Sequence, residues 1–349
     1  MGKQDVGDLE VIRQNLEAWL CQQLDKDDDF NIGELNFPEA SGESSVTLLF
    51  DAIWKGGQDK FVLRMAPRQS EVFESHDLKL QYDIMGIVAE HGIPVPGLVG
   101  YEANADLLGS DFYVMNFCEG LIPPDQPPMA FGSWVSELSA KERSIMWNNG
   151  LLTLSQIHQI PIENYDLPCL PRAAVDEAPA AHEMRMYQSL VEQGLRESAD
   201  PILDDAWQLL QQTLPQNGPR KLCWGDSRPG NIIYQNLKPV AVVDWELASI
   251  GDPLSDLAWY FWIDYTNSVG LGVDKMSGIP TFSDAYQQWS NATGLPIDNI
   301  AWYELFVMWR FAVIMEKKMM AMMKVDANFT DFPNHGAGML APLMEKLTA

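Results

Sequence analysis

Apolar and polar positions follow different periods in the two parts of the chain, and the first part opens with a helical pattern. A helix is predicted over residues 8–24, because apolar residues recur there every three or four positions. Asp8 is placed to cap its N-terminus, and the acidic run that starts at Asp25 ends it. The apolar face of this helix consists of Leu9, Ile12, Leu16, Trp19 and Leu20.

Short β-like runs follow this helix and predict a sheet. The predicted elements are a hairpin of strands 46–54 and 60–65, a helix over 75–91, and strands around 98–101 and 112–117. Residues 55–58, which contain two glycines, predict the turn of the hairpin. These elements form a β-rich N-terminal lobe over residues 1–117.

The remainder of the chain, residues 118–349, is dominated by helical patterns. Residues 118–133 contain four prolines and two glycines and predict an irregular connection between lobes. One β-rich island, residues 221–245, interrupts the helices. The predicted fold is therefore bilobal and α+β, with a small β-rich lobe joined to a larger helical lobe, and a cleft between such lobes is a usual ligand site. The predicted helices span 139–160, 180–196, 202–214, 254–265, 281–292 and 300–323.

Net charge narrows the range of partners. The 349 residues include 23 Lys and Arg against 49 Asp and Glu, a formal charge of −26, and such a field repels nucleic acid and anionic membrane surfaces. Residues 1–117 hold 8 basic and 21 acidic residues and residues 118–349 hold 15 and 28, so each part carries −13. This charge fits either a surface that favours solubility or a cleft that attracts a cation or a metal–nucleotide complex.

The cysteines and the N-terminus indicate a cytoplasmic protein. The four cysteines lie far apart, without the paired spacing of a zinc site or a disulfide framework. The first residues lack an apolar signal core, and no segment reaches the roughly 18 to 20 apolar residues that a membrane span needs. We therefore expect a protein of the reducing cytoplasm without membrane partners.

Polar residues interrupt the β-rich island at places that suit a cation. If residues 231–235 and 240–244 pair as antiparallel strands around a four-residue turn, Asn231 lies opposite Asp244, about 4.5 to 5.5 Å away. Mg²⁺ prefers oxygen ligands and is usually held by one or two protein groups plus substrate phosphates. Asn231 and Asp244 match that requirement.

Asp226 lies five residues before Asn231, in a loop with two glycines and a proline. Tight turns there would direct its carboxylate towards the same place, which makes it a candidate general base. An aspartate in such a loop can also simply form an Asx turn. The nearby Asn231 and Asp244 favour the catalytic interpretation.

The island resembles a known family, the kinase-like phosphotransferases that include aminoglycoside phosphotransferases and choline kinases. Their catalytic loop is written H-G-D-x-x-x-x-N and is followed by a strand ending in a metal-binding Asp; here the sequence reads Trp224-Gly225-Asp226, then Asn231, then Asp244. The sequence D-W-E-L-A-S-I-G-D-P, which starts at Asp244, is similar to the branch found as a phosphotransferase domain fused to some animal acyl-CoA dehydrogenases.

This resemblance implies a protein-kinase-like fold and roles for individual residues. Asp226 would accept the proton of the attacking hydroxyl, while Asn231 and Asp244 would hold Mg²⁺ on the nucleotide phosphates. Asp252 and Asp256 resemble supports of the loop. Trp224 replaces the usual His at a position that looks structural.

The first lobe resembles the nucleotide-binding lobe of the same family. Residues 41–47 are similar to its phosphate-covering turn, with Gly42, Ser44 and Ser45 as small residues that let backbone N–H groups approach phosphates. A Ser/Gly turn is equally typical of a plain hairpin. Arg64 stands where kinases usually place the lysine that contacts nucleotide phosphates, and arginine also pairs with phosphate.

Two further features of this lobe concern nucleotide binding. Gln81 stands where the family often has Glu, so a neutral hydrogen bond is expected in place of the usual ion pair to the cation of the third strand. The strand that ends at Met115 and Phe117 resembles the hinge whose backbone binds adenine, and it also fits a buried strand.

The resemblance predicts an ATP- or GTP- and Mg²⁺-dependent kinase of a hydroxyl on a small molecule. The acceptor itself is left unspecified: the nearest branch suggests a hydroxyacyl-CoA, whereas the broader family and the acidic charge suggest an aminoglycoside-like cation. The departures at Arg64, Gln81 and Trp224 leave a second hypothesis open, a nucleotide-binding pseudokinase that serves as an interaction module. The sequence contains no motif for zinc-dependent hydrolysis or for catalysis by a Ser nucleophile. We expect His158 to be a hydrogen-bonded core residue.

Overall fold

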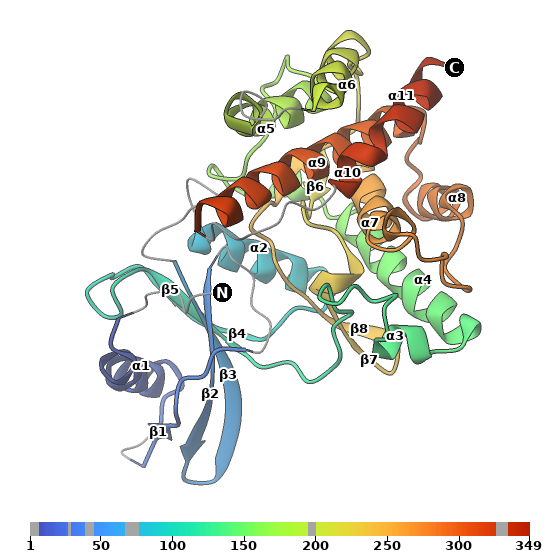
Figure 1. The fold of residues 1–349 in the computed structure, drawn as a ribbon. Helices are drawn as coiled ribbons and strands as arrows, with labels where there is room; N and C mark the ends of the chain where they lie inside the picture. The colour runs from blue at the N-terminus through green and yellow to red at the C-terminus, as the bar shows by residue number, and fades with distance from the viewer. Residues whose placement is uncertain (1–6, 27–28, 39–44, 67–76, 195–199, 326–333) are drawn as a thin grey trace. The chain divides into compact units, whose positions relative to one another are not determined.

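A computed structural model describes residues 7–26, 29–38, 45–66, 77–194, 200–325 and 334–349 (Figure 1). The chain forms two compact units. The first consists of Met1–Glu119 with Ala241–Glu246, and the second of Gly120–Val240 with Leu247–Ala349. The short segment Ala241–Glu246 thus places Asp244 in the first unit.

The first unit is built on a five-stranded sheet with the order β1-β2-β3-β5-β4, in which neighbouring strands are antiparallel. Its predicted strands and helices are confirmed in type and to within three residues in position, whereas the two-residue strand Asn31–Ile32 was not predicted. The elements are α1 (Leu9–Gln23), β1 (Asn31–Ile32), β2 (Val46–Trp54), β3 (Gly57–Met65), α2 (Leu78–Glu90), β4 (Leu98–Glu102) and β5 (Phe112–Asn116).

The β2–β3 hairpin is tighter than the sequence suggested. Trp54 pairs with Gly57, so the turn is Lys55-Gly56 and β3 begins three residues earlier than predicted. Gly56 has φ 101°, a left-handed backbone that glycine adopts without a steric penalty. Two-residue turns of this kind match the twist of paired strands.

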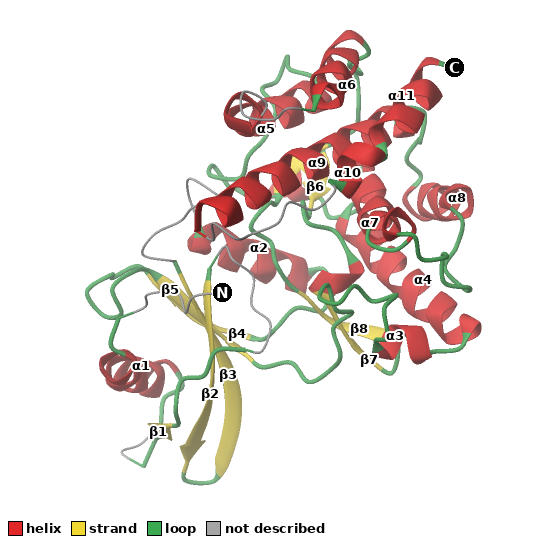
Figure 2. Ribbon diagram, in the orientation of Figure 1, coloured by secondary structure: helices red, strands yellow, loops and turns green. Residues whose placement is uncertain are grey.

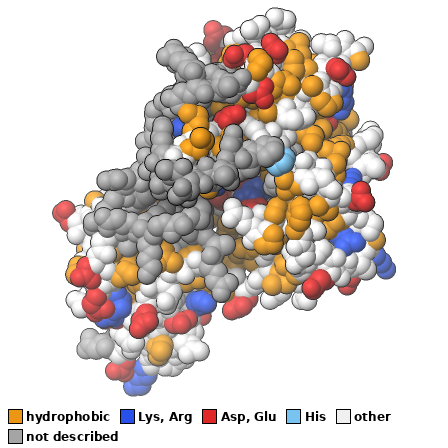
Figure 3. Space-filling view, in the orientation of Figure 1, with side chains coloured by type: hydrophobic (Ala, Val, Ile, Leu, Met, Phe, Trp, Pro, Cys, Tyr) orange, Lys and Arg blue, Asp and Glu red, His pale blue; other side chains and the backbone are white. Residues whose placement is uncertain are grey.

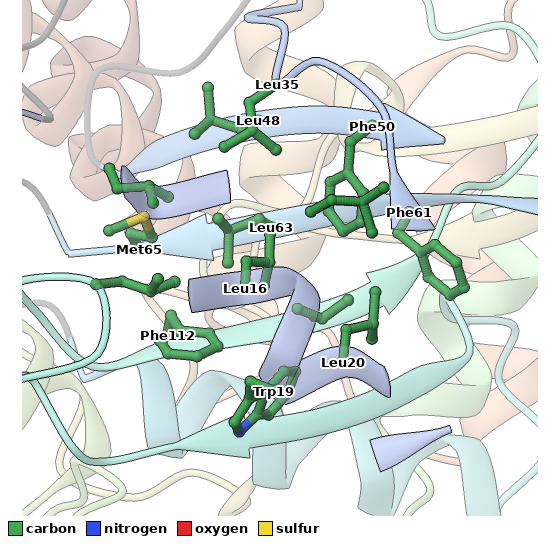
Figure 4. Close-up of a cluster of buried hydrophobic side chains, with 14 of the residues drawn as sticks. Leu16, Trp19, Leu20, Leu35, Leu48, Phe50, Phe61, Leu63, Met65 and Phe112 are labelled. Atoms are coloured by element: carbon green, nitrogen blue, oxygen red, sulfur yellow. The ribbon is translucent and has the colours of Figure 1, made fainter. Parts of the chain in front are cut away.

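Helix α1 packs its apolar face on this sheet and forms the core of the unit. Asp8 caps the helix as predicted, because its carboxylate accepts the N–H of Glu10 at 2.9 Å. Trp19 meets Phe112 of β5 edge to face at 4.9 Å. Figure 4 shows these side chains between the helix and the strands. The buried cluster includes Leu16, Trp19, Leu20, Leu48, Phe50, Phe61, Leu63, Met65 and Phe112.

The second unit is mostly helical (Figure 2). Among the described residues its α-helices are α3 (Trp134–Glu137), α4 (Ala140–Ile157), α5 (Pro179–Gly194), α6 (Pro201–Gln212), α7 (Leu254–Thr266), α8 (Phe282–Thr293), α9 (Ile300–Val325), α10 (His335–Gly338) and α11 (Leu340–Thr348). Its short strands are β6 (Lys221–Cys223), β7 (Ile232–Gln235), β8 (Lys238–Val242) and β9 (Ser249–Gly251), of which β8 ends in the segment assigned to the first unit.

Helices α7 and α9 form the centre of this unit. Nearly every residue of α7 is buried, and α9 packs against α5, α6, α7, α10 and α11. Residues 118–133, predicted as an irregular connection, contain neither helix nor strand. The antiparallel sheet and the helical part together confirm the predicted α+β class.

The surface reflects the acidic composition. On the face shown in Figure 3, acidic side chains are scattered and form no single patch. The four cysteines form no disulfide in the structure. Within the described ranges, no helix has both the length and the apolar composition to cross a membrane.

Leu16 offers a test of the α1 packing. Leu16→Ala removes a fully buried side chain from the cluster, and we expect the free energy of unfolding to fall by about 2 to 5 kcal/mol. Urea unfolding followed by tryptophan fluorescence measures this loss. Val11→Ala, at an exposed position of the same helix, should change stability by less than about 0.5 kcal/mol. Equal midpoints for the two variants would mean that α1 does not contribute to the core.

Candidate active site

A buried carboxylate fixes the loop that carries the predicted catalytic residues. Asp256, near the start of α7, is 2% exposed. Its two carboxylate oxygens accept the backbone N–H groups of Trp224 at 2.6 Å and Gly225 at 2.8 Å. Its carbonyl oxygen accepts the hydroxyl of Ser227 at 2.7 Å. Asp256 therefore supports the loop, as the sequence predicted, and the position of Trp224 is structural.

His158 extends this support and is a hydrogen-bonded core residue, as expected. The indole N–H of Trp289 donates to His158 Nδ1 at 2.9 Å, and His158 Nε2 lies 3.1 Å from Asp256 Oδ2. Because Nδ1 accepts a proton donor, the neutral ring carries its proton on Nε2 and donates it to Asp256. His158, directly after α4, and Trp289 of α8 thus help to hold the Asp256 carboxylate that fixes the loop.

Gly225 needs both its small size and its unusual backbone. Its φ is 90°, and a Cβ atom at this position would lie 2.1 Å from the carbonyl oxygen of Leu247. Any larger residue would therefore displace the loop directly before Asp226.

Asp226 and Asn231 lie together, as the loop spacing predicted. The side-chain nitrogen of Asn231 donates to Asp226 Oδ2 at 2.7 Å and to the Asp226 carbonyl at 3.0 Å. With its nitrogen on Asp226, the planar amide presents its oxygen on the other side, and that oxygen is the kind of ligand that Mg²⁺ prefers. Asn231 thus has a donor atom suitable for a metal.

Two residues that the sequence analysis missed also hold the carboxylate of Asp226. Arg228 Nε donates to Oδ2 at 3.0 Å, and the indole N–H of Trp259, from α7, donates to Oδ1 at 2.7 Å. Arg228 also forms a 2.5 Å ion pair with Asp125, from residues 118–133. Arg228 could have been suspected as a cation two positions after Asp226, whereas nothing in the sequence connects Trp259 or Asp125 with the loop.

These contacts favour an ionised Asp226. Burial alone would raise its pKa, but the charge of Arg228 and the hydrogen bonds from Trp259, Arg228 and Asn231 outweigh burial and lower the pKa below its usual value. The side chain is still 18% exposed. Asp226 is thus a charged, reachable acceptor held by side chains, which differs from the local Asx turn considered above.

The predicted β7–β8 geometry is wrong. The turn consists of Asn236 and Leu237 alone, with φ 51° and 64°, instead of four residues. Asparagine tolerates this left-handed backbone, and Asn149 donates to the carbonyl of Leu237 at 2.8 Å. Asn231 lies in the 3₁₀ helix η2 (Pro229–Asn231) and Asp244 lies beyond β8, so the strand-pairing argument for a shared cation fails.

Asp244 lies in the first unit and has φ 64°, an unusual backbone for a residue other than glycine. Such strain is typical of functional positions. Together with Glu246 it acts electrostatically on Arg64 of β3. The proposal that Asn231 and Asp244 share a metal therefore rests on the family pattern and on the side-chain oxygen atoms that both residues could offer to a metal.

Arg64 lies among polar partners in the first unit. Its guanidinium donates to Thr47 of β2 at 2.9 Å. Burial disfavours its charge, but Tyr113, Asp244 and Glu246 outweigh burial and raise its pKa. Gln81 of α2 accepts the hydroxyl of Tyr113 at 3.5 Å. Gln81 therefore accepts a hydrogen bond from Tyr113, where the sequence analysis expected one with Arg64, and nearby acids balance Arg64.

The remaining predicted nucleotide contacts are only partly described. Gly42 and Ser44 lie outside the described residues. Ser45 is buried directly before β2, and its hydroxyl has no hydrogen-bond partner among the residues that the structure describes.

Met115 pairs with strands on both sides. The N–H of Phe117 donates to the Lys60 carbonyl at 2.8 Å, so a nucleotide would have to use the carbonyl of Phe117.

The chain belongs to the phosphotransferase enzyme family, whose sequence model matches residues 46–293. Human acyl-CoA dehydrogenase family member 11 is 27% identical over 296 residues, which cover 81% of this chain and 35% of that protein. Mouse acyl-CoA dehydrogenase family member 10 is 28% identical over 270 residues, which cover 74% of this chain and 24% of that protein. The chain therefore spans about a third or less of these relatives.

Solved structures show the same fold. A putative aminoglycoside phosphotransferase from Ralstonia eutropha superimposes with a TM-score of 0.69 at 19% identity, covering 96% of both chains. Choline kinase LicA from Streptococcus pneumoniae gives a TM-score of 0.56 at 14% identity, covering 96% of this chain and 98% of LicA. The fold is protein-kinase-like, as the sequence resemblance implied.

A small cavity beside Gly225 and Asp256 is lined by a buried acid, Glu183. It measures about 10 Å³, room for about one water, and is lined in part by Glu183, Gly225, Asp256 and Arg310. Glu183 is buried on α5, and burial raises its pKa to about 8, with Asp252 and Asp256 adding to the effect. Glu183 is therefore mostly protonated at neutral pH.

Glu183 should make the stability of the chain depend on pH. Its pKa rises from 4.5 to about 8 on folding, so in that range only the folded state keeps the proton and stability falls as pH rises, by up to about 1.4 kcal/mol per pH unit. Glu183→Gln should flatten this decline in urea unfolding measured from pH 5 to 8.

Glu177→Gln is the control for this measurement. A hydrogen bond from Arg185 lowers the pKa of Glu177, so this acid is ionised in both states across the same range. The control should keep the wild-type decline. An unchanged pH dependence in Glu183→Gln would show that Glu183 is charged in the fold.

Proposed function

We propose that this chain is an ATP- or GTP- and Mg²⁺-dependent kinase that phosphorylates a hydroxyl group of a small molecule. The observation that carries this proposal is the carboxylate of Asp226, which is ionised, 18% exposed and held by Asn231, Arg228 and Trp259. Phosphoryl transfer mainly requires positioning and charge neutralisation. A fixed carboxylate in a loop anchored by Asp256 meets the positioning requirement.

Each predicted residue has a role in this proposal. Asp226 accepts the proton of the attacking hydroxyl, Asn231 and Asp244 supply oxygen ligands for Mg²⁺, and Arg64 contacts phosphate. The metal, when bound, neutralises charge on the phosphates. Residues 41–47, with Gly42, Ser44 and Ser45, cover the phosphates, and the backbone at Met115 and Phe117 lies along the base.

Nucleotides in related structures support the cofactor. One structure of LicA is a complex with AMP, and one structure of an aminoglycoside 2′-phosphotransferase is a complex with GDP. In the described part of the chain, no group of three or more His, Cys, Asp or Glu residues is arranged to hold a metal. Two protein ligands plus phosphates remain the proposed arrangement, as is usual for Mg²⁺.

Two acceptors follow from the relatives. A hydroxyacyl-CoA is proposed because the curated relatives are acyl-CoA dehydrogenase family members. An aminoglycoside-like cation is proposed because of the structural relatives and the net charge of −26. We place the reaction in the cytoplasm, with neither nucleic acid nor membrane as a partner.

Asp226→Asn tests the reaction. We expect phosphotransfer, measured as ADP release with each acceptor class, to fall about 10²- to 10⁴-fold, because an amide cannot accept the hydroxyl proton. Asp166→Asn, at an exposed position of the same unit, should retain the wild-type rate. An unchanged rate in Asp226→Asn would remove Asp226 as the base, and nucleotide binding without any transfer by the wild type would favour the pseudokinase.

Thermal unfolding with ATP and Mg²⁺ tests the cofactor. A ligand present at 100 times its Kd and bound only to the folded state stabilises it by about 2.7 kcal/mol, so the melting temperature should rise when both are added. Asp244→Asn should reduce the part of the rise that requires Mg²⁺, whereas Asp51→Asn, at an exposed position of β2, should not. No rise at millimolar nucleotide would contradict the proposed cofactor.

A further inference from the structure

Trp259 makes an unusual contact with the proposed base. It lies on α7, three residues after Asp256, and is 5% exposed. Its indole N–H, a group that can only donate, reaches Asp226 Oδ1 at 2.7 Å. A hydrogen bond this short to a charged acceptor is among the stronger ones in proteins.

The two oxygens of Asp226 are used differently. Oδ2 accepts two donors, Asn231 Nδ2 at 2.7 Å and Arg228 Nε at 3.0 Å. Among the described residues, Oδ1 accepts the single donor of Trp259. Since each carboxylate oxygen has about two acceptor positions, Oδ1 keeps one for a further donor. An incoming hydroxyl therefore finds its acceptor at Oδ1.

A buried arginine holds the Trp259 ring in place. The guanidinium carbon of Arg310, on α9, lies 3.5 Å from the centre of a Trp259 ring, a cation–π contact that is stronger away from water. Arg310 is 3% exposed, and its Nη2 donates to the Gly225 carbonyl at 2.9 Å. Arg310 thus links the Trp259 ring to the residue directly before Asp226.

We propose that Trp259 is the positioning residue of the base: its N–H occupies one acceptor position of Asp226 Oδ1 and directs the other towards the attacking hydroxyl. The inference rests on the proposed function. As the new O–P bond forms, the hydroxyl proton moves to Oδ1, the bond from the γ-phosphorus to the bridging oxygen breaks, and its electron pair leaves with ADP. The proton then passes from Asp226 to solvent.

Two variants at position 259 separate the N–H from the packing of the ring. Trp259→Phe removes the donor together with part of the ring. Replacement of Trp259 by 3-benzothienylalanine exchanges the N–H for sulfur and keeps the bicyclic shape, so it covers the case in which Trp259→Phe does not fold. Trp302→Phe is the matched control, because Trp302 is also buried and its indole N–H donates to the Leu210 carbonyl at 3.1 Å.

The first readout is independent of any substrate. In protein with ¹³C-labelled aspartate carboxyl groups, the signal of Asp226 is identified by its loss in Asp226→Asn and is titrated by NMR. Without the indole donor, its midpoint should rise by about one pH unit or more. The control should leave the midpoint unchanged. An unchanged midpoint in a folded position-259 variant would overturn the inference.

The second readout is ADP formation against pH with ATP, Mg²⁺ and an acceptor that the wild type uses. The acid limb of kcat should shift upward by the same amount, and kcat on its plateau should fall about tenfold, with KM for ATP unchanged. A fall in rate without a shift of the acid limb would overturn the inference while the proposed function stands. A wild type without phosphotransfer would overturn the proposed function, and this inference with it, whatever the titration shows.

Discussion

The hydrogen bonds of the Asp256 carboxylate are the constraint on which the candidate site depends. A carboxylate buried to this degree is stable only when donors surround it. It obtains them from Trp224, Gly225 and His158, and in doing so it fixes the direction in which the loop leaves β6. Gly225 can follow that direction because it lacks a Cβ. The position of Asp226 is therefore a consequence of how α7 begins.

Each unit contains its own arrangement of charged groups. In the second unit, Arg228 is shared between Asp226 and Asp125, so that one cation stabilises the base and also ties down residues 118–133. In the first unit, Arg64 is balanced by Asp244 and Glu246 instead of by a residue of α2. The two arrangements use different cations, Arg228 for the proposed base and Arg64 for the acids beside β3.

Residues 118–133 contribute more than a connection. Leu121 exchanges two backbone hydrogen bonds with Tyr234 of β7, of 2.8 and 2.9 Å, and thereby adds an edge to the β7–β8 hairpin. Asp125, four residues later, reaches Arg228. A proline-rich segment is suited to this role, because prolines restrict the backbone and have no N–H group that would need an acceptor.

The sequence by itself determined most of the helices and strands, the α+β class and the closeness of Asp226 to Asn231, because periodicity and a spacing of five residues act locally along the chain. It did not determine the two-residue turn after Gln235, since whether Asn236 and Leu237 take left-handed backbones depends on what holds them, here Asn149. Only the tertiary structure brought Trp259 and Asp125 to the loop. Trp259 lies 33 residues after its partner Asp226, and Asp125 lies 103 residues before its partner Arg228. Such contacts are set by how α7 and residues 118–133 pack in the folded chain, and a single sequence records the elements but not their packing.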